Sequence, residues 1–406
     1  MFKIALVSYE YPPDTGFGGV GTYVKQVAAL LKGANCDVHI FAGTFGISSI
    51  MVTHNVTIHK VHCNCPQTFK KNVVNVFAIE NNIQAFNVIE SPEIHGNASE
   101  IVKAYPQIPL VVRLHAPNYL VEHLKQYHTP FSAKCRFVFG AFRQGRLDAG
   151  YWRKYNFKVD EDYIFAKQAT VIVAPSTTMK NWAMQHWHFN INQITVLLNP
   201  YLPSNNFLNI DIVSADQSKK QILFFGRLNV LKGLVNATFA IKNLLKLYPD
   251  YSFCVVGDDG ASHLHNLTMR QWMKQQLKNV LHKVTFINAI DNEALANIIA
   301  DAEIVLLPSL FESFSYTCAE AMASGKAVVG AAKTGMADMI INGQNGLLVN
   351  TKSGNAIYKA LQILIKNKQL RQKMGEAARE TIITKFEADT LQNSYFNFYK
   401  KIASKQ

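Results

Sequence analysis

The 406-residue sequence predicts an α/β protein built on two parallel sheets. Short apolar strands alternate with amphipathic helical stretches, and the same alternation starts again in the second half of the chain. The length fits two domains. Hydrophobic residues make up 49% of the chain and charged residues 17%, a composition typical of globular domains with large cores.

The first series opens with an apolar segment, residues 4–8, followed by a helical stretch at 22–32. That stretch places Val24, Val27, Ala28 and Leu31 on one face. Further strands are predicted at 38–42, 88–90, 110–115 and 171–175. Continuous apolar runs of this kind are typical of parallel strands that are buried on both faces. We assign residues 1–203 to a first Rossmann-like domain.

The second series follows a linker formed by the loop at 199–206 and the polar stretch 214–220. Strands are predicted at 222–225, 253–257, 284–287, 304–308 and 327–330, with helices between them. Residues 204–386 then form a second Rossmann-like domain. Residues 387–406 form a helix with Leu391, Tyr395, Phe398 and Tyr399 on one side, and we expect it to pack back toward the first domain.

The six cysteines lack the paired spacing of a zinc site, and no run of about 18 uncharged apolar residues occurs. We therefore expect a cytoplasmic protein with reduced thiols. The net charge of +13 favours anionic partners, which include phosphorylated small molecules, nucleic acid and anionic lipid. Charge alone does not choose among them.

Residues that directly follow strands are the first candidates for a site, because open parallel sheets bind ligands beyond the carboxyl ends of their strands. Two such sheets predict a site in a cleft between them. The first strand-end loop carries glycines at 16, 18, 19 and 21 and opens a helix. Glycines there let N–H groups approach a phosphate, but the spacing is not G-x-G-x-x-G, and a plain tight turn explains it equally well.

Arg227 and Lys232 follow the first strand of the second series, in the segment FFGRLNVLKG. Both side chains only donate hydrogen bonds, so they can converge on a diphosphate. The alternative is a pair of solvated basic residues. The motif described next makes that alternative less favoured.

The most informative motif is PSLFESFSYTCAEAMASG, residues 308–325. Glu312 follows a strand, and Glu320 lies on a helix predicted to begin near Ser315. The helix N-terminus offers N–H groups to a phosphate, and the two carboxylates can accept hydroxyl groups from two separate polyols. Glu320 could instead be a surface residue, but its neighbours are small or apolar, and a poorly solvated carboxylate needs donors.

These motifs together resemble the GT-B glycosyltransferases of family 4, the retaining class called glycosyl transferases group 1. The resemblance is carried by FGRL with KG, by two glutamates with seven residues between them, and by the segment NGQNGLLV at 342–349. It covers nearly the whole chain and is most specific in the second half. It implies two Rossmann-like domains whose sheets face each other across a cleft, with the C-terminal helix crossing back to the first domain.

The resemblance also implies roles for individual residues. The catalytic set comprises Glu312, His115, Arg227 and Lys232. The donor-binding set comprises Gly19, Arg227, Lys232, Phe314, Ser315, Tyr316, Glu320 and Asp258. Arg227 and Lys232 would hold the diphosphate, and Glu320 would accept the ribose hydroxyls. Glu312 would contact the transferred sugar, and His115 would lie over it.

We expect transfer without a metal, because no Asp-x-Asp stands at a strand end. Arg227, Lys232 and the helix dipole would then stabilise the leaving diphosphate. The predicted reaction moves a hexose, with retention, from a UDP- or GDP-sugar to a hydroxyl of a glycan or glycolipid, with no bound cofactor. Ser315 departs from the glycine of many relatives, and Asp338 stands where they often have glutamate.

Residues 134–158 hold seven basic residues against one acid, interleaved with aromatic residues. This mixture suits a lipid-linked acceptor or a peripheral contact with the anionic inner face of a membrane. The alternative is a solvated helical insertion that is packed by its own aromatic residues.

Other functions remain open on the sequence. A sugar-nucleotide epimerase or a phosphorylase would share the GT-B architecture. A nucleic-acid- or membrane-binding module is favoured only by the basic charge, and the aromatic and basic motifs of nucleic-acid binders are absent. An NAD oxidoreductase would need a G-x-G-x-x-G after an opening strand, which the sequence lacks.

Overall fold

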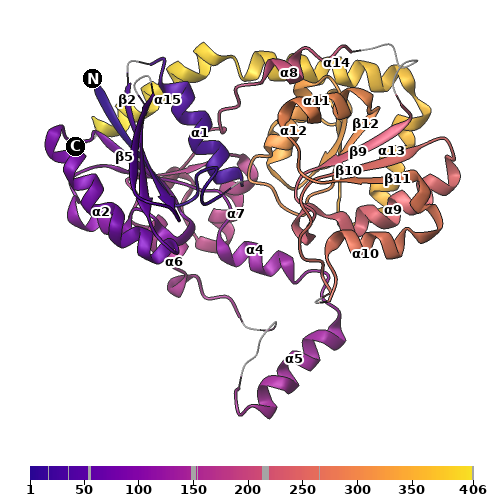
Figure 1. Ribbon diagram of the computed structural model, residues 1–406, viewed down its shortest axis with the longest axis horizontal. Coiled ribbons are helices and arrows are strands. Elements are labelled where there is room, and N and C mark those ends of the chain that lie inside the picture. The colour runs from indigo at the N-terminus through magenta and orange to yellow at the C-terminus, as the bar shows by residue number, and fades with distance from the viewer. Residues whose placement is uncertain are drawn as a thin grey trace. The chain divides into compact units, whose positions relative to one another are not determined.

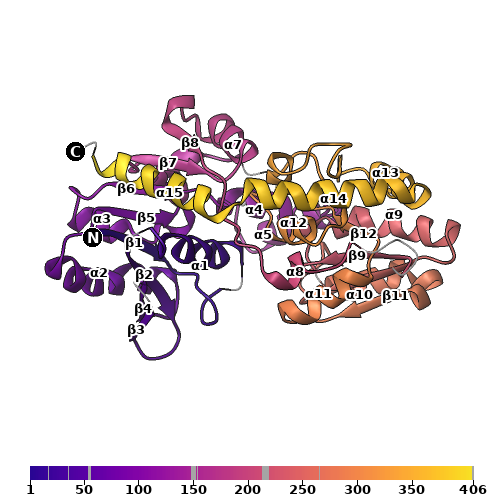
Figure 2. The same ribbon diagram turned by 90° about the horizontal axis from the view of Figure 1, so that it is seen from above.

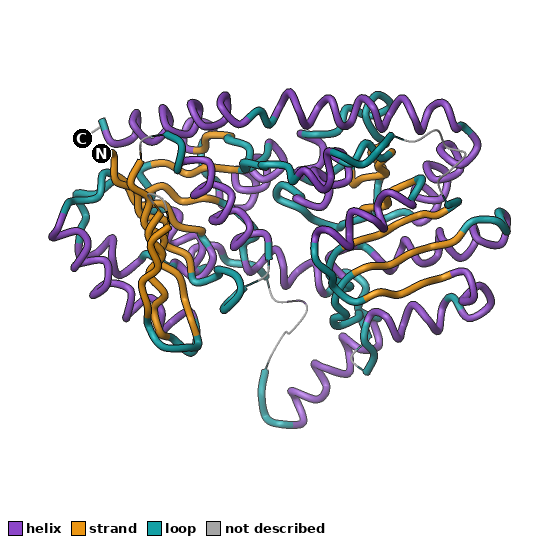
Figure 3. The backbone as a smooth tube through the Cα atoms, turned by 45° about the horizontal axis from the view of Figure 1, so that its top comes forward, coloured by secondary structure: helices purple, strands orange, loops and turns teal. Residues whose placement is uncertain are grey.

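The computed structural model describes residues 1–16, 18–34, 36–53, 56–147, 152, 154–212, 219–264 and 266–404. It divides into two compact units (Figure 1). The first comprises Met1–Asn118, Asn156–Leu202 and Phe386–Gln406, and the second comprises Tyr119–Tyr155 and Pro203–Lys385. In each unit, helices flank a mainly parallel sheet (Figure 3). The predicted α/β class with two parallel sheets is confirmed. No described helix is long and apolar enough to cross a bilayer.

The first unit contains an eight-stranded sheet in the order β3-β4-β2-β1-β5-β6-β7-β8. All neighbours are parallel except the β3–β4 pair, which is antiparallel. The strands are β1 (Phe2–Ser8), β2 (Cys36–Thr44), β3 (Ser49–Thr53), β4 (Val56–His62), β5 (Val88–Pro92), β6 (Leu110–Arg113), β7 (Val171–Ala174) and β8 (Ile194–Val196). The sequence did not predict β3, β4 or β8, because β3 is exposed at every residue and β8 has only three.

Helices cover both faces of this sheet, and Figure 1 shows it between α2 and α1. The helices are α1 (Gly19–Leu31), α2 (Pro66–Ile83), α3 (Ser99–Ala104), α6 (Glu161–Ala166), α7 (Thr177–Trp187) and α15 (Ala388–Ala403). The C-terminal helix α15 packs against α1 and β5, as Figure 2 also shows. Its buried side chains are Leu391, Tyr395, Tyr399 and Ile402. The expected return of the C-terminal helix to the first unit is therefore confirmed.

The second unit contains a six-stranded parallel sheet in the order β11-β10-β9-β12-β13-β14. Its strands are β9 (Gln221–Phe225), β10 (Ser252–Val256), β11 (Val284–Ile287), β12 (Ile304–Leu307), β13 (Ala327–Ala331) and β14 (Leu347–Val349). Four residues of β9 and all of β12 and β13 are buried. Five of the strands match the sequence prediction, and β14 is an addition at the edge.

The helices of this unit also cover both faces of the sheet, with α9 and α10 on one side and α11 and α12 on the other (Figure 1). The helices assigned to this unit are α4 (Asn118–Lys125), α5 (Phe131–Arg143), α8 (Asn205–Leu208), α9 (Leu234–Leu247), α10 (Met269–Gln276), α11 (Asn292–Asp301), α12 (Tyr316–Ala323), α13 (Gly354–Lys366) and α14 (Lys368–Lys385), and α5 extends away from the sheet (Figure 1). The polar stretch predicted as a linker lies largely outside the described residues. The carboxyl ends of β9 and β12 carry the loops that build the candidate site.

Candidate active site

Lys232 and Glu312, which are 80 residues apart in the sequence, meet beyond the carboxyl ends of β9 and β12. Lys232 Nζ lies 2.6 Å from Glu312 Oε1, and the two side chains are 21% and 15% exposed. Ser309 Oγ donates a second hydrogen bond to the same oxygen at 2.8 Å. Glu312 Oε2 accepts no hydrogen bond from the described residues. A half-buried carboxylate is thus held by two donors on one oxygen, while its other oxygen can accept a hydroxyl group.

Short local interactions place Lys232 at the end of a 3-10 turn, Val230–Lys232. The Asn229 side chain accepts from Lys232 N at 3.1 Å and caps this turn. The Lys232 side chain passes beside Gly226, since its Cε would lie 3.9 Å from a Cβ there. Thr317 Cγ2, on the first turn of α12, would lie 3.9 Å from the same Cβ. Sequence reasoning found the lysine but missed Asn229 and Ser309, although Ser309 stands inside the quoted motif.

Helix α12 begins at Tyr316, four residues after Glu312, and carries Glu320 on its second turn. The Ser315 side chain caps the helix by accepting from Cys318 N at 3.3 Å. Ser315 has φ 94°, in the left-handed region that costs a non-glycine residue about 1–3 kcal/mol. A glycine would adopt this conformation without that cost. The cap, worth about 1 kcal/mol, offsets part of the strain.

Glu320 is half-buried, and burial raises its pKa to about 7, while the nearby positive charge of Lys232 opposes the shift. Small or apolar residues surround it on α12, among them the buried Cys318, Ala319, Ala321 and Met322. The carboxyl group is therefore about half ionised near neutral pH. Its protonation state can couple to any ligand that needs a carboxylate acceptor.

We expect the affinity for a nucleoside diphosphate to rise about tenfold from pH 6 to pH 8. A carboxyl whose pKa lies near 7 is mainly protonated at pH 6, and only the ionised form could accept two ribose hydroxyls in the role that the family resemblance implies for Glu320. Calorimetry across this range should show the rise in the wild type and in Glu376→Gln, whose substituted side chain is exposed on α14. Part of this increase in affinity comes from ionisation of the nucleotide's own phosphates. Glu320→Gln should remove the remaining part. The same pH profile in Glu320→Gln would contradict the role of this carboxyl.

Arg227 and Asp258 lie at the neighbouring ends of β9 and β10. Leu228 N donates to the Asp258 carbonyl at 2.8 Å, and Asp258 Oδ1 accepts from Ala289 N at 3.4 Å. The Arg227 guanidinium is exposed and makes no hydrogen bond or ion pair with the described residues. The structure thus gathers Lys232, Glu312 and Glu320, and leaves Arg227 free beside this group.

Phe314, Ser315 and Tyr316 lie where the loop after β12 turns into α12. Phe314 and Ser315 are buried at 2% and 5% exposure, and the Phe314 and Tyr316 rings pack edge to face at 5.1 Å. Gly335 N donates to the Glu312 carbonyl at 2.7 Å. The loop after β13 therefore supports the loop that carries Glu312 and leads into α12.

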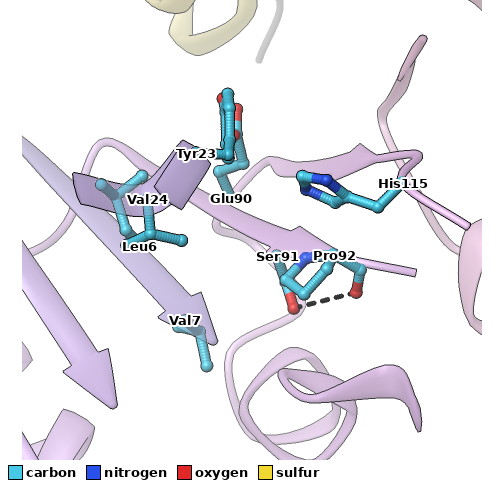
Figure 4. Close-up of a pocket in the computed structure, with 8 residues that line it drawn as sticks. All are labelled: Leu6, Val7, Tyr23, Val24, Glu90, Ser91, Pro92 and His115. Atoms are coloured by element: carbon cyan, nitrogen blue, oxygen red, sulfur yellow. Dashed lines mark hydrogen bonds between the residues drawn. The ribbon is translucent and has the colours of Figure 1, made fainter. Parts of the chain in front are cut away.

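His115 follows β6 in the first unit and lines a small pocket with Tyr23, Glu90 and Pro92 (Figure 4). Its ring packs edge to face on Tyr23 at 5.2 Å. Burial and the charge of Arg113 lower the pKa of His115 to about 3, so the imidazole is neutral. Its buried Nε2 has no hydrogen-bond partner among the described residues. A neutral ring with a free nitrogen can donate to or accept from a hydroxyl group.

Two buried carboxylates support the loop that carries His115. Both oxygens of Glu93 accept from His115 N at 2.9 Å. Asp162 accepts from Asn118 N at 2.7 Å and from His95 N at 3.0 Å. Burial raises the pKa of each acid, and each also receives backbone hydrogen bonds. Sequence reasoning missed both residues, although Glu93 comes three residues after the strand predicted at 88–90.

A charged cluster inside the first unit anchors α15 close to the His115 pocket. Arg113 Nε lies 3.5 Å from Glu90 Oε1, and Glu90 accepts hydrogen bonds from the hydroxyls of Tyr23 and Tyr399. These side chains are buried. Gly19 is the first residue of α1, one turn before Tyr23, and a Cβ on Gly19 would meet nothing within 4 Å. The open surface at Gly19 therefore belongs to the helix that also contacts His115.

Comparison with known proteins gives a consistent family assignment. The model described as Glycosyl transferases group 1 matches residues 207–381, and the model described as Glycosyltransferase Family 4 matches residues 17–201. A glycogen synthase of Mycobacterium tuberculosis is 22% identical over 421 residues, which cover 98% of this chain and 94% of the relative. The predicted resemblance to family 4 is confirmed.

Solved structures share the fold over the full length. A sucrose-phosphate synthase from Thermosynechococcus elongatus matches with a TM-score of 0.73 and 17% identity, covering 100% of both chains. The HepE protein of Anabaena in complex with UDP matches with a TM-score of 0.67 and 16% identity, covering 99% of this chain and 100% of that one. The fold is GT-B. The chain is a family 4-like glycosyltransferase.

Proposed function

We propose that this glycosyltransferase moves a hexose, with retention and without a metal, from a nucleoside-diphosphate sugar to a hydroxyl group of a glycan or glycolipid. The observation that carries the proposal is the contact of Lys232 with Glu312 beside the N-terminus of α12. One fixed cation and one fixed carboxylate suit the two ends of a sugar diphosphate. The bound UDP in the Anabaena protein supports UDP as a donor nucleotide, and GDP is the second candidate.

In this proposal, Lys232 and the exposed Arg227 bind the diphosphate, together with the N–H groups that open α12. Glu320 accepts ribose hydroxyls, and the base lies near Asp258. Glu312 holds the sugar through Oε2. It is tied to Lys232 and Ser309 through Oε1, so it positions the sugar and does not act as a nucleophile. The departing phosphate oxygen then takes the acceptor proton on the face where the new bond forms, which retains the configuration.

His115 and Gly19 belong to the first unit, and we propose that both residues contact the donor. The neutral His115 imidazole would bind a sugar hydroxyl through its free Nε2. Gly19 would let its backbone N–H approach the phosphates without a side chain in the way. Loss of His115 should therefore reduce transfer while leaving UDP affinity unchanged.

We expect Glu312→Gln to lower turnover about 100-fold and to change UDP or GDP affinity less than threefold. Glutamine keeps the size and loses the charge that fixes Lys232 and holds the sugar hydroxyls. Steady-state transfer and calorimetric nucleotide titration measure the two effects separately. Glu293→Gln, on α11, is the matched control. An equal loss of turnover and of nucleotide affinity would contradict the positioning role.

The donor class is tested by thermal unfolding with UDP, GDP, ADP, dTDP and NAD, each with and without EDTA. A ligand at about 100 times its Kd should add about 2.7 kcal/mol to the free energy of unfolding. We expect one diphosphate to stabilise the protein to the same extent in EDTA. Stabilisation by NAD alone would contradict nucleotide-sugar binding. Phosphate-dependent release of the sugar would favour the phosphorylase alternative, and isomerised donor without an acceptor would favour the epimerase.

A peripheral contact with the cytoplasmic face of an anionic membrane is a second proposal, favoured by helix α5. Phe131, Phe139 and Phe142 are 73%, 69% and 68% exposed there, and Arg136 and Arg143 are exposed beside them. Exposed aromatic and basic residues on one helix are typical of interfacial binding. Tyr151 and Arg153, from the same basic segment, lie outside the described residues.

Vesicle binding separates this membrane contact from a solvated insertion. We expect the wild type to sediment with anionic vesicles at low salt, and the double variant Phe139→Ser, Phe142→Ser to lose most of that binding. Phe45→Ser, at a residue that is 58% exposed in the first unit, is the control. Absence of wild-type binding, or an equal loss in the control, would contradict the membrane contact.

A further inference from the structure

We propose that the first unit holds a zinc ion between the sheet and α2, bound by His39, His59 and Glu80, at a site separate from the donor-binding residues. His39 lies on β2, His59 on the neighbouring β4 and Glu80 near the end of α2. One nitrogen from each histidine and a carboxylate oxygen of Glu80 lie within 4.8 Å of one another. No sequence pattern marks this site, since the three residues come from three separate elements.

The ligand atoms converge because β2 and β4 pair in parallel register. Phe41 pairs with His59 and His39 with Thr57, so both histidines point to the face that α2 covers. The two imidazole rings stack at 5.2 Å with an interplanar angle of 16°. Residue Glu80 then approaches both rings from α2. Ligands from three elements would cross-link two strands and the helix that covers them.

The distances fit a tetrahedral ion. Zinc bonds of about 2.0–2.1 Å place tetrahedral ligand atoms about 3.3 Å apart. His39 Nδ1 lies 3.0 Å from His59 Nε2 and 3.7 Å from Glu80 Oε2, and His59 Nε2 lies 4.0 Å from Glu80 Oε1. These three separations differ from the tetrahedral value by at most about 0.7 Å, and the two Glu80 distances involve different carboxylate oxygens. The fourth position would hold water, which can reach the site past Glu80, whose side chain is 16% exposed.

The surroundings of His39 match those of a metal ligand. Its second nitrogen, Nε2, lies 3.3 Å from Asp37 Oδ2, and a carboxylate behind a histidine typically orients a zinc-bound ring. Zinc needs imidazole nitrogens that offer a lone pair, and His39 Nδ1 and His59 Nε2 face each other at 3.0 Å.

A metal-free explanation also exists. His59 Nε2–H can donate to His39 Nδ1, which makes the pair an ordinary buried hydrogen bond. On zinc binding, that hydrogen would move to His59 Nδ1, which has no partner among the described residues. Lys3 lies 4.0 Å from Glu80 Oε2 and opposes the cation, although its ammonium donates to the Glu80 and Gln84 carbonyls at 2.8 and 3.1 Å. The nitrogen lone pairs and two carboxylates favour zinc, and the experiment decides between the two explanations.

The test uses the full-length protein after dialysis against EDTA. We expect equilibrium dialysis with ZnCl2 to give one tightly bound zinc per chain, and zinc to raise the melting temperature by several degrees. Cobalt(II) should give the visible absorption of a tetrahedral ion. Glu80→Gln should weaken zinc binding at least tenfold and abolish the thermal shift. His62→Gln, at an exposed histidine at the end of β4, should behave like the wild type.

The results distinguish the two explanations even if a variant unfolds. No bound zinc in the wild type, or an octahedral cobalt spectrum, would overturn the proposal. Zinc affinity that is equal in Glu80→Gln and the wild type would also overturn it. If Glu80→Gln does not fold, zinc affinity is measured in His39→Gln instead, where it should also fall. The wild-type cobalt spectrum tests the tetrahedral geometry without any variant. Because metal binding and stability are read out, the outcome does not depend on the proposed transfer reaction.

Discussion

Replacing Lys232 with methionine is expected to lower turnover by about 10²–10³-fold. The lysine supplies one of two cations proposed to stabilise the leaving diphosphate, and it also holds Glu312 at 2.6 Å. Methionine keeps an unbranched side chain of similar length and removes the charge. Single-turnover transfer at saturating donor measures the effect on chemistry, and Lys246→Met, at an exposed residue near the end of α9, is the matched control.

The two roles of Lys232 can be separated by combining Lys232→Met with Glu312→Gln. If the lysine acts mainly by orienting Glu312, the double variant should be no slower than the slower single variant. If it acts mainly on the diphosphate, the two losses should multiply, and donor affinity should fall in Lys232→Met alone. Unchanged turnover in Lys232→Met, or an equal loss in Lys246→Met, would contradict both roles.

Parallel-sheet topology let the sequence predict at which edge of the second sheet the candidate residues lie. The carboxyl ends of parallel strands lie at one edge of a sheet, so the residues after β9 and β12 were expected at the same edge. The apolar segments at 222–225 and 304–308 were long enough to be read as strands. The sequence did not predict the contact between Lys232 and Glu312, which depends on the pairing of β9 with β12, and the structure adds its distance and the hydrogen bond from Ser309.

The supporting residues could not be predicted in the same way, because their roles depend on tertiary contacts. Glu93 and Asp162 are 69 positions apart (162 − 93), and nothing in the sequence shows that both bind the loop around His115. The His39–His59 pair requires the register of two strands, one of which the sequence did not predict. The left-handed φ of Ser315 could not be predicted either, because serine, unlike glycine, does not indicate a left-handed backbone conformation.

Replacing Gly233 with alanine is expected to destabilise the second unit by about 3–5 kcal/mol, in the range of severe single substitutions. Gly233 has φ 69°, and a Cβ there would lie 1.7 Å from the Pro308 carbonyl oxygen. The loop after β9 must therefore move away from the loop after β12, and these loops carry Lys232 and Glu312. We expect the melting temperature to fall by about 6–20 °C and transfer to fall further than the loss of folded protein explains.

Gly343→Ala is a matched control for this substitution. Gly343 also has a left-handed φ, of 83°, but a Cβ there would meet nothing within 4 Å. Alanine at this position should lower the free energy of unfolding by only about 1 kcal/mol, the cost of a left-handed φ in a residue with a Cβ. Transfer should be unchanged. The difference between the two variants then measures the close approach of the two site loops. If Gly233→Ala and Gly343→Ala lose equal stability, backbone conformation alone explains the requirement for glycine at 233. The packing of the two loops would then not be what holds Lys232 against Glu312.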